Sequence, residues 1–426
     1  EVKKVYQPIR FKADNLQSGR IKVTNDFDFT DLDNYNFSWF VKGDDKTISS
    51  GRYGTLDLDA GESKILQFNL SNIRPKPGVR YFLTIQAKTR FKKPLVPRGH
   101  LVAWDQFELP IYREVDVHDP KEYPPINLFK NDRGAEIYGQ GFKVIFSRES
   151  GQISEYVVDG KDLITKPAEA HFWRAPNDND LGNGMPNRTD VWKNAGTRMQ
   201  VKVLNSSLKN NTAEIIMVSE DSLSGTSVRS RYLVFGNGVL ALDQFITAGA
   251  SVEAEIPRIG LLFSLPGDFD QVTWFGRGPH ESYWDRKTSA AVGHYSGSVW
   301  EQSYPYVRPQ ETGNKTDVFW MALSNGEIGL MAKGSPTFDG SVHQYPYSDL
   351  DYTPNSQKHG KLDLKSKDHV DWLIDHKQMG VGGDNSWGAR PHSKYSLYPG
   401  EYEYSFMLIP FQKGDDLNKI SKLKLK

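Results

Sequence analysis

Short runs in which apolar and polar residues alternate recur along almost the whole of this 426-residue sequence. Examples are RIKVTNDF at 20–27, RYFLTIQAKT at 80–89 and VKVLNSSLKNNTAEIIMVSE at 201–220. Gly, Asn, Asp and Pro separate the runs, and no stretch sustains the period of an amphipathic helix. A period of two places successive side chains on opposite faces of a strand. The chain is therefore predicted to be all-β.

The first 115 residues contain seven such runs at near-regular spacing, a pattern typical of an immunoglobulin-like β-sandwich. The runs are VYQPIRFKA, RIKVTNDF, NFSWFVKG, TLDLDA, KILQFNL, RYFLTIQAKT and VAWDQFELPIY. Because the chain contains no cysteine, core packing must stabilise this sandwich without a disulfide. The core is predicted to form around the aromatic side chains of Trp39, Phe40, Tyr81, Phe82 and Trp104.

A polar segment at 116–133 separates this sandwich from the rest of the chain. Pro120, Pro124 and Pro125 stiffen the segment, which we interpret as a linker. Residues 134–426 then continue with strands and turns, including several long strands. A single large β-supersandwich is the architecture that such a pattern favours.

The charge balance excludes some classes of partner. Lys plus Arg and Asp plus Glu both number 53, so the net charge gives no reason to expect binding to nucleic acid or to an anionic membrane. The lack of cysteine also excludes thiolate zinc sites and cysteine nucleophiles, and leaves the redox compartment open. The sequence opens at Glu1 directly in strand-like residues, without a signal-peptide pattern. We expect the chain to be part of a longer polypeptide, so its targeting cannot be read.

One polar motif, HFWRAPNDNDLGNG, spans residues 171–184. Its aspartates do not have the spacing of an EF-hand calcium loop. Arg174 is predicted to pair with one carboxylate, while Asn177 or Asn179 caps a turn. An irregular cation site is the alternative.

A second motif, WFGRGPHESYWDRK at 274–287, lacks the complete glycine pattern of a dinucleotide site. Its polar residues are predicted to form either acid–base groups or, as we favour, a satisfied network at a turn; they are His280, Glu281, Asp285 and Arg286. Downstream segments add charged residues whose spacing specifies no partner, namely Arg308, Glu311, Lys315, His343, Asp349 and Asp351. No P-loop, serine elbow or zinc-protease motif is present in the sequence.

The segment MGVGGDNSWG, from Met379 to Gly388, combines a glycine-built turn with an indole. Adjacent glycines permit a tight backbone, and Asp384, Asn385 and Ser386 have short side chains that bond to turn backbone. The apolar face of Trp387 suits the C–H face of a sugar ring, with polar groups nearby for its hydroxyls. The competing interpretation is a turn whose tryptophan anchors a sheet.

Four motifs in order resemble the C-terminal part of glycoside hydrolase family 2 β-galactosidases. They are RAPNDND, GRGPHESYWDR, PYVRPQETGNKTDVFW and MGVGGDNSW. The resemblance extends over the whole chain. It implies that 1–115 is the second immunoglobulin-like domain of such an enzyme, and that 134–426 is its terminal "small chain" domain, a supersandwich similar to galactose mutarotase.

This resemblance implies that the chain is a non-catalytic segment of a retaining β-galactosidase that hydrolyses terminal β-D-galactosides. In the family, two catalytic glutamates lie on a (β/α)₈ barrel that precedes this region, and nothing in the sequence resembles that barrel. No catalytic residue, metal ligand or cofactor is therefore expected here, and the Mg and Na ions often used by the family belong to the barrel. Trp387 matches the residue that stacks on sugar, and its loop supports are Gly382, Gly383, Asp384, Asn385 and Ser386.

The expected partners are a galactoside, the missing barrel of the same polypeptide and a further copy in a homo-oligomer. Localisation is open between the cytoplasm and the periplasm of a bacterium. Two functions of other classes stand as alternatives: a mutarotase-like sugar epimerase and a carbohydrate-binding module. The epimerase needs a histidine acid and a carboxylate base in one cleft, and the candidate histidines are His280, His294, His343, His359, His369 and His376.

Overall fold

The computed structural model describes residues 1–249, 252–351, 360–385 and 388–426. Two compact units make up the chain. Unit 1 contains residues 1–116 with 291–294, and unit 2 contains residues 117–290 with 295–426. The predicted all-β class is confirmed, because strands form both units and the longest α-helix in the described part has five residues.

Unit 1 contains two antiparallel sheets, one with strand order β1-β2-β5 and one with order β4-β3-β6-β7. The strands are β1 (Ile9–Asn15), β2 (Arg20–Asn25), β3 (Tyr35–Gly43), β4 (Lys46–Gly54), β5 (Ser63–Gln67), β6 (Tyr81–Thr89) and β7 (Leu101–Glu108). Two short helices accompany them, α1 (Val2–Val5) and η1 (Leu32–Asn34). The predicted sandwich therefore has its seven strands, divided three and four between the sheets.

One predicted strand of unit 1 is wrong. The run TLDLDA at 55–60 forms no strand, and β4 comes from the preceding, more polar segment. Leu56 and Leu58 are nevertheless buried, so their alternation reports burial of an extended segment rather than sheet pairing. Asn25 reaches this segment from β2, donating from its side-chain amide to the Leu58 carbonyl at 3.1 Å.

Aliphatic side chains contribute more to the core of unit 1 than the aromatic prediction suggested. Tyr81 and Phe82 are buried, whereas Trp39, Phe40 and Trp104 are only half-buried. The core side chains of the strands include Ile9, Ile21, Val23, Phe37, Val41, Leu83 and Ile85. Wide indole rings at the margin can cover this core while keeping their N–H groups near water.

Unit 2 begins with the 3₁₀ turn η2 (Pro120–Glu122) and a five-stranded antiparallel sheet of order β12-β11-β10-β9-β8. Its strands are β8 (Asn127–Asn131), β9 (Gly134–Gly139), β10 (Phe142–Ser147), β11 (Gln152–Val158) and β12 (Lys161–Asp162). β8 lies inside the segment interpreted as a linker. Its five residues, NLFKN, do not alternate, and all but Leu128 are exposed, so the sequence carries no strand period at this position.

Among the described residues, the second sheet of unit 2 has twelve strands. They are β13 (Lys166–His171), β14 (Gln200–Lys209), β15 (Thr212–Asp221), β16 (Thr226–Phe235), β17 (Leu240–Ala248), β18 (Arg258–Pro266), β19 (Gln271–Gly278), β20 (Ala291–Ser298), β21 (Lys315–Ser324), β22 (Ile328–His343), β23 (His369–Gln378) and β24 (Gly400–Gln412). β22 pairs along its first half with β24 and along its second half with β23, and β21 pairs with both halves. The sheet therefore branches at β22.

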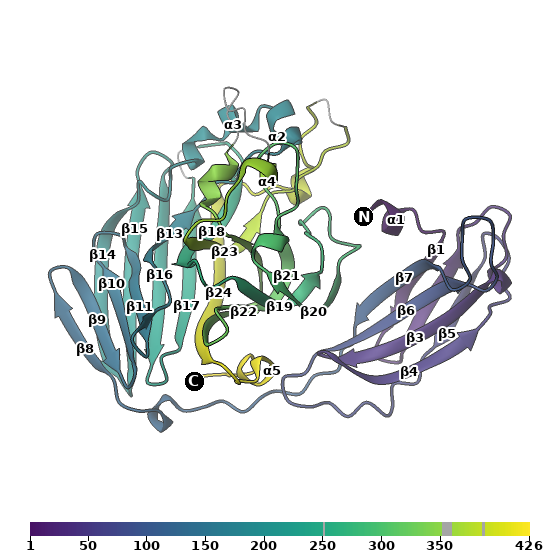
Figure 1. Ribbon diagram of the computed structural model, residues 1–426, viewed down its shortest axis with the longest axis horizontal. Coiled ribbons are helices and arrows are strands. Elements are labelled where there is room, and N and C mark those ends of the chain that lie inside the picture. The colour runs from purple at the N-terminus through teal and green to yellow at the C-terminus, as the bar shows by residue number, and fades with distance from the viewer. Residues whose placement is uncertain (250–251, 352–359, 386–387) are drawn as a thin grey trace. The chain divides into compact units, whose positions relative to one another are not determined.

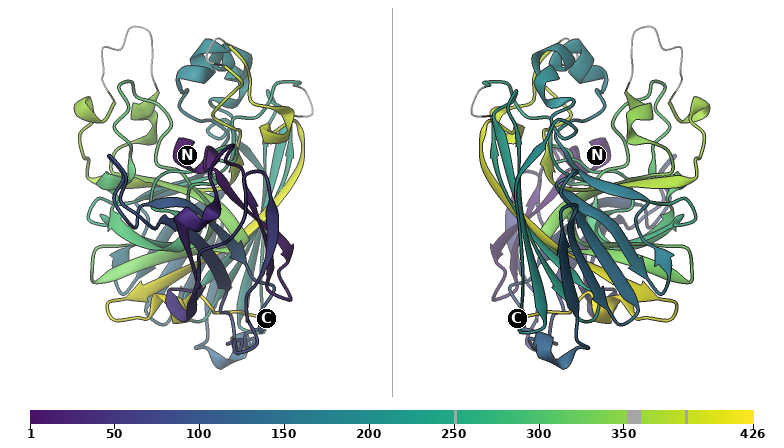
Figure 2. Two further views of the ribbon diagram at one scale, coloured as in Figure 1. Left: turned by 90° about the vertical axis from the view of Figure 1, so that its right-hand side faces the viewer. Right: turned by 90° about the vertical axis from the view of Figure 1, so that its left-hand side faces the viewer.

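The two sheets of unit 2 lie side by side and share one hydrophobic core (Figures 1 and 2). In β15 the buried positions alternate strictly, with Ala213, Ile215 and Met217 facing inward. Tyr232 of β16 packs at 4.7 Å between ring centroids on Phe146 of β10, so side chains from both sheets interdigitate. This core holds the strand ends in fixed positions.

Short helices gather at the two ends of unit 2, with α2, α3 and α4 at one end and α5 at the other (Figure 1). Their bounds are α2 (Asp178–Gly182), α3 (Met185–Arg188), η3 (Asp190–Trp192), η4 (Trp300–Gln302), η5 (Tyr347–Leu350), α4 (Gly360–Asp363), η6 (Ser393–Tyr395) and α5 (Leu417–Ile420). None of the helices in the described part of the chain has the length and apolar character that crossing a membrane requires.

Candidate functional site

The glycine-rich segment 379–383 leaves the end of β23, and side chains from other motifs hold its backbone. Arg174, just beyond β13, is fully buried and donates to the carbonyl oxygens of Met379 and Gly380, the second at 2.8 Å. Its guanidinium also pairs with Asp180 through two bonds, Nε–Oδ2 at 3.0 Å and Nη2–Oδ1 at 2.7 Å. Burial is the largest influence on the pKa of Arg174 and acts to lower it, but the charge and hydrogen bonds of Asp180, with the charges of Glu311 and Asp285, together raise that pKa.

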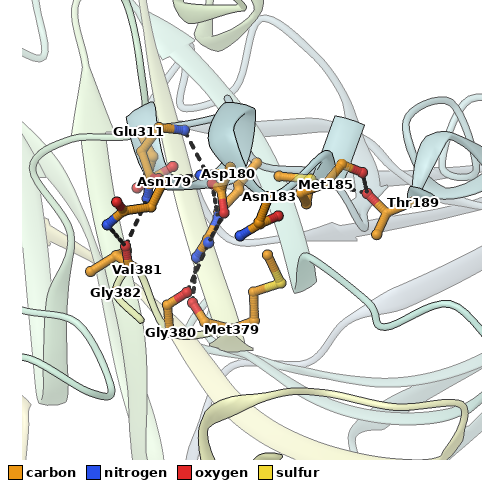
Figure 3. Close-up of polar contacts among 12 residues, drawn as sticks. Asn179, Asp180, Asn183, Met185, Thr189, Glu311, Met379, Gly380, Val381 and Gly382 are labelled. Carbon is orange, nitrogen blue, oxygen red and sulfur yellow. Dashed lines mark hydrogen bonds and ion pairs between the residues drawn. The ribbon is translucent and has the colours of Figure 1, made fainter. Parts of the chain in front are cut away.

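The start of α2 adds a second set of anchors. Asn177 is the N-cap of this helix and forms a capping box with Asp180, as the sequence predicted for one of the asparagines. The side-chain amides of Asn177 and Asn179 both donate to the Val381 carbonyl oxygen, at 3.3 and 3.0 Å. Figure 3 shows Asn179 and Asp180 beside the backbone of Val381 and Gly380.

Asp285 holds the same segment by its N–H groups. The Val381 N–H donates to Oδ1 at 3.0 Å and the Gly382 N–H donates to Oδ2 at 2.9 Å. Gly380 has to be glycine here, because a Cβ atom at this position would lie 2.7 Å from Asp285 Oδ2. The close approach of carboxylate and backbone therefore depends on a missing side chain.

Glu281, four residues earlier, holds a different segment. It accepts the Gly313 N–H at 2.9 Å, the Arg286 guanidinium at 2.5 Å and the hydroxyl of Tyr306. Burial, followed by the charge of Glu281, raises the pKa of Tyr306 to about 12, so this hydroxyl stays a donor at neutral pH. The prediction of a satisfied network at this turn is confirmed by these bonds.

Glu311 links the segment after Tyr306 to the buried centre of unit 2. Its carboxylate pairs with the guanidinium of Arg258 at 2.7 Å and accepts the hydroxyl of Tyr347. The Tyr347 hydroxyl in turn accepts the Ala175 N–H at 2.8 Å, beside Arg174. Gln378, the residue before the glycine-rich segment, donates to Glu311 at 3.3 Å. All four sequence motifs thus converge on one end of β23.

Sequence reasoning missed Arg258 and Asp375, which lie at the centre of this network. Both are fully buried, and their side chains form an ion pair at 3.4 Å. Burial raises the pKa of Asp375 to about 8, although the charge of Arg258 acts to lower it. The available signal was a single arginine within the otherwise apolar run IPRIGLLFSLP, because a charge in a buried strand needs a partner.

The predicted loop supports lie as follows. Gly382 donates to Asp285, and Gly383 lies so close to Ala389 that a Cβ atom would be 2.3 Å from the Ala389 carbonyl oxygen. Asp384 contacts the His392 ring at 2.8 Å, and Asn385 accepts the Ala389 N–H at 3.4 Å. Ser386 and Trp387 lie outside the described residues, so their roles stay predictions.

Three histidines of unit 2, His171, His343 and His376, are fully or partly buried. Of these, only His343 is fully buried; His171 and His376 are half-buried, and His343 and His376 are both candidate acids of the epimerase alternative. Burial, with the charge of Arg258 next, lowers the pKa of both His171 and His343 to about 3. Neutral imidazoles in a closed interior are poor proton donors at neutral pH.

The described ranges contain no group of three or more His, Asp or Glu side chains arranged to hold a metal ion. Asp178 and Asp180 are the aspartates considered for an irregular cation site, and each lies beside a different arginine. Asp180 pairs with Arg174, and Asp178 lies 3.5 Å from the exposed Arg308. The interpretation of Arg174 as the partner of one carboxylate is confirmed.

A small β-sandwich joined to a large branched sheet, with four ordered motifs around a glycine-rich loop, is the domain pair expected of large β-galactosidases. The chain belongs to the β-galactosidase family. Residues 138–408 match the family described as "Beta galactosidase small chain", and residues 21–110 match "Beta-galactosidase, domain 4".

Similar proteins include two bacterial β-galactosidases. That of Priestia megaterium is 33% identical over 417 residues, and that of Streptococcus thermophilus is 27% identical over 429 residues. Each alignment covers 96% of this chain and 39% of the relative, so the chain spans about 39% of the length of these curated relatives. Among solved structures, galactose 1-epimerase from Lactobacillus acidophilus aligns over 68% of this chain and 99% of its own, at 9% identity and a TM-score of 0.37.

The buried pair of Arg174 and Asp180 makes a first prediction possible. Arg174→Met leaves the Asp180 carboxylate buried without its partner, so we expect the free energy of unfolding to fall by about 3–5 kcal/mol. Urea denaturation followed by circular dichroism measures this loss. Arg231→Met is the matched control, because Arg231 pairs with Glu214 and Asp243 at a surface where all three side chains are about one-third exposed. That variant should lose less than about 1 kcal/mol, and equal losses would contradict the prediction.

The buried histidines predict acid sensitivity. The pKa of His343 is about 3 in the folded chain and about 6.5 in an unfolded one. Between these values the unfolded state binds more protons, so stability is lost as the pH falls. This group alone should cost about 2 kcal/mol at pH 5. Urea denaturation at pH 7 and pH 5 should show a correspondingly smaller loss for His343→Gln. His100→Gln, at an exposed position of unit 1, should behave as the unaltered chain does.

Proposed function

We propose that this chain is the part of a β-galactosidase that presents a tryptophan loop to the sugar site, while the catalytic glutamates lie in another domain of the complete enzyme. The observation that carries the proposal is the convergence of anchors on the backbone of residues 379–382. The segment belongs to one of the four motifs; two of the others contact it directly, and the third is linked to it through Glu311. A loop backbone held by several hydrogen bonds keeps the residue that follows it in a fixed position, which favours contact of that residue with a ligand.

A fixed loop base gives a physical advantage in sugar binding. An aromatic ring stacked on a sugar face contributes on the order of 1 kcal/mol, and ordering a flexible loop on binding can remove that gain. Anchors present before the sugar arrives avoid this entropy loss. The buried position of Arg174 and Asp180 means that water does not compete for the anchoring bonds.

The same proposal defines partners and cofactors. The domain bearing the two glutamates is the partner that completes the site, and terminal β-D-galactosides are the substrates of the complete enzyme. Any Mg or Na ions used in catalysis belong to that domain. The two alternatives receive less support, since one of the candidate histidines of the epimerase, His343, is closed off and the aromatic content alone does not specify a binding module.

The isolated chain should have no galactosidase activity. It provides no pair of glutamates on a barrel, so nitrophenyl β-galactoside should hydrolyse no faster than in buffer. A complete β-galactosidase at the same molar concentration is the positive control. Turnover that stays with the chain through successive purification steps and follows its concentration would overturn the proposal.

Trp387 should affect sugar binding in the complete enzyme. Trp387→Ala should raise the KM for lactose or nitrophenyl galactoside by roughly tenfold, because about 1.4 kcal/mol of binding corresponds to that factor. Trp387→Phe keeps an apolar ring, so its KM should lie between that of the unaltered enzyme and that of Trp387→Ala. Steady-state kinetics measure both variants, and an unchanged KM and kcat in Trp387→Ala would show that the tryptophan does not contact the substrate.

A further inference from the structure

We propose that Asp285 is a positioning residue for sugar binding, which acts by fixing the backbone that leads to Trp387. This inference rests on the proposed function of the tryptophan loop. Asp285 is far from that loop in sequence. We assign to its carboxylate an effect on the KM of the enzyme, although Asp285 itself need not contact the sugar.

Asp285 completes a clamp on both sides of one short backbone segment. Arg174 binds the carbonyl oxygens of Met379 and Gly380, and two asparagines bind that of Val381. Asp285 binds the next two N–H groups, one on each carboxylate oxygen. With donors on the carbonyls and an acceptor on the amides, the peptide planes from Gly380 to Gly382 cannot rotate without breaking bonds.

A carboxylate suits this place better than a neutral group does. Hydrogen bonds to an ionised acceptor are roughly twice as strong as those between neutral groups. Two adjacent N–H groups that point to one side also form a concave site for an anion. Gly380 provides the necessary room, since a methyl group there would lie 2.7 Å from Oδ2 and 2.9 Å from Cγ of Asp285.

The turn that bears Asp285 holds its shape by other bonds. Tyr283 and Arg286 exchange backbone hydrogen bonds at 3.0 and 2.8 Å, so Trp284 and Asp285 form the tip of a tight hairpin. The Trp284 ring packs edge-on against Tyr395, with centroids 5.8 Å apart. The Tyr395 carbonyl oxygen accepts the Gly380 N–H at 2.7 Å. Removing the carboxylate should therefore free the segment without unfolding the hairpin.

The test is a double-mutant cycle in the complete β-galactosidase. Asp285→Asn keeps the size of the side chain but turns one of its two acceptors into a donor, so we expect KM to rise by about fivefold. In the Trp387→Ala background the same change should alter KM by less than about twofold, because the residue that it positions is already absent. A purely structural residue would instead give effects that multiply.

The matched control is Asp317→Asn. Asp317 is also an aspartate of unit 2, held by Arg277 and Lys287, and its change should leave KM as it is. Hydrogen exchange measured by mass spectrometry over peptides covering 379–389 gives a second readout. Asp285→Asn should speed exchange of the Val381 and Gly382 amides, whereas Asp317→Asn should not. If Asp285→Asn does not fold, Gly380→Ala disrupts the same contact from the other side.

The outcomes separate the two proposals. A raised KM with faster exchange, and no further rise in the Trp387→Ala background, supports the positioning role. An unchanged KM in Asp285→Asn, or effects that multiply with those of Trp387→Ala, overturns that role while the tryptophan contact stands. If Trp387→Ala itself leaves KM unchanged, the proposed function fails, and the positioning role fails with it.

Discussion

Two guanidinium groups buried in unit 2 determine how one end of its large sheet is built. Arg174 and Arg258 have no exposed surface, and a buried charge is tolerated only beside an opposite charge and enough acceptors. Asp180 and Glu311 provide the charges. Asp180 lies only six residues from Arg174, but the other partners come from distant segments: Glu311 for Arg258, and the carbonyl oxygens of Met379 and Gly380 for Arg174. These longer-range contacts bring the motif segments to one place.

The backbone carbonyls that Arg174 still needs come from the glycine-rich segment after β23. Under the proposed function, stability and sugar binding therefore depend on the same contacts. The buried Arg174 guanidinium obtains hydrogen-bond acceptors, and the first residues of the loop are held in a fixed position. Preorganisation of this kind places a ligand-contacting residue before the ligand arrives, so that binding does not have to order the loop.

Much of the fold could be predicted from the sequence, because strict alternation in segments such as Arg20–Thr24 reports a half-buried strand directly. Two failures have physical causes. Leu56 and Leu58 alternate and are buried, yet their segment pairs with no sheet, whereas β8 forms a strand although its mostly exposed residues do not alternate. The motifs of the site were visible, but the pairing of Asp285 with Gly382 joins residues 97 positions apart, which no local pattern encodes.

Every anchor on residues 379–382 binds a main-chain atom of the loop and not one of its side chains. Gly380 and Gly383 need to lack a side chain beside Asp285 and Ala389, and Met379 packs in the core, but at the other positions the anchors place little restriction on which residues the loop carries. Mutation can therefore change the tip while the base keeps its geometry. Under the proposed function, the sugar preference of the site can change by small steps, without the chain first having to lose and regain a stable fold.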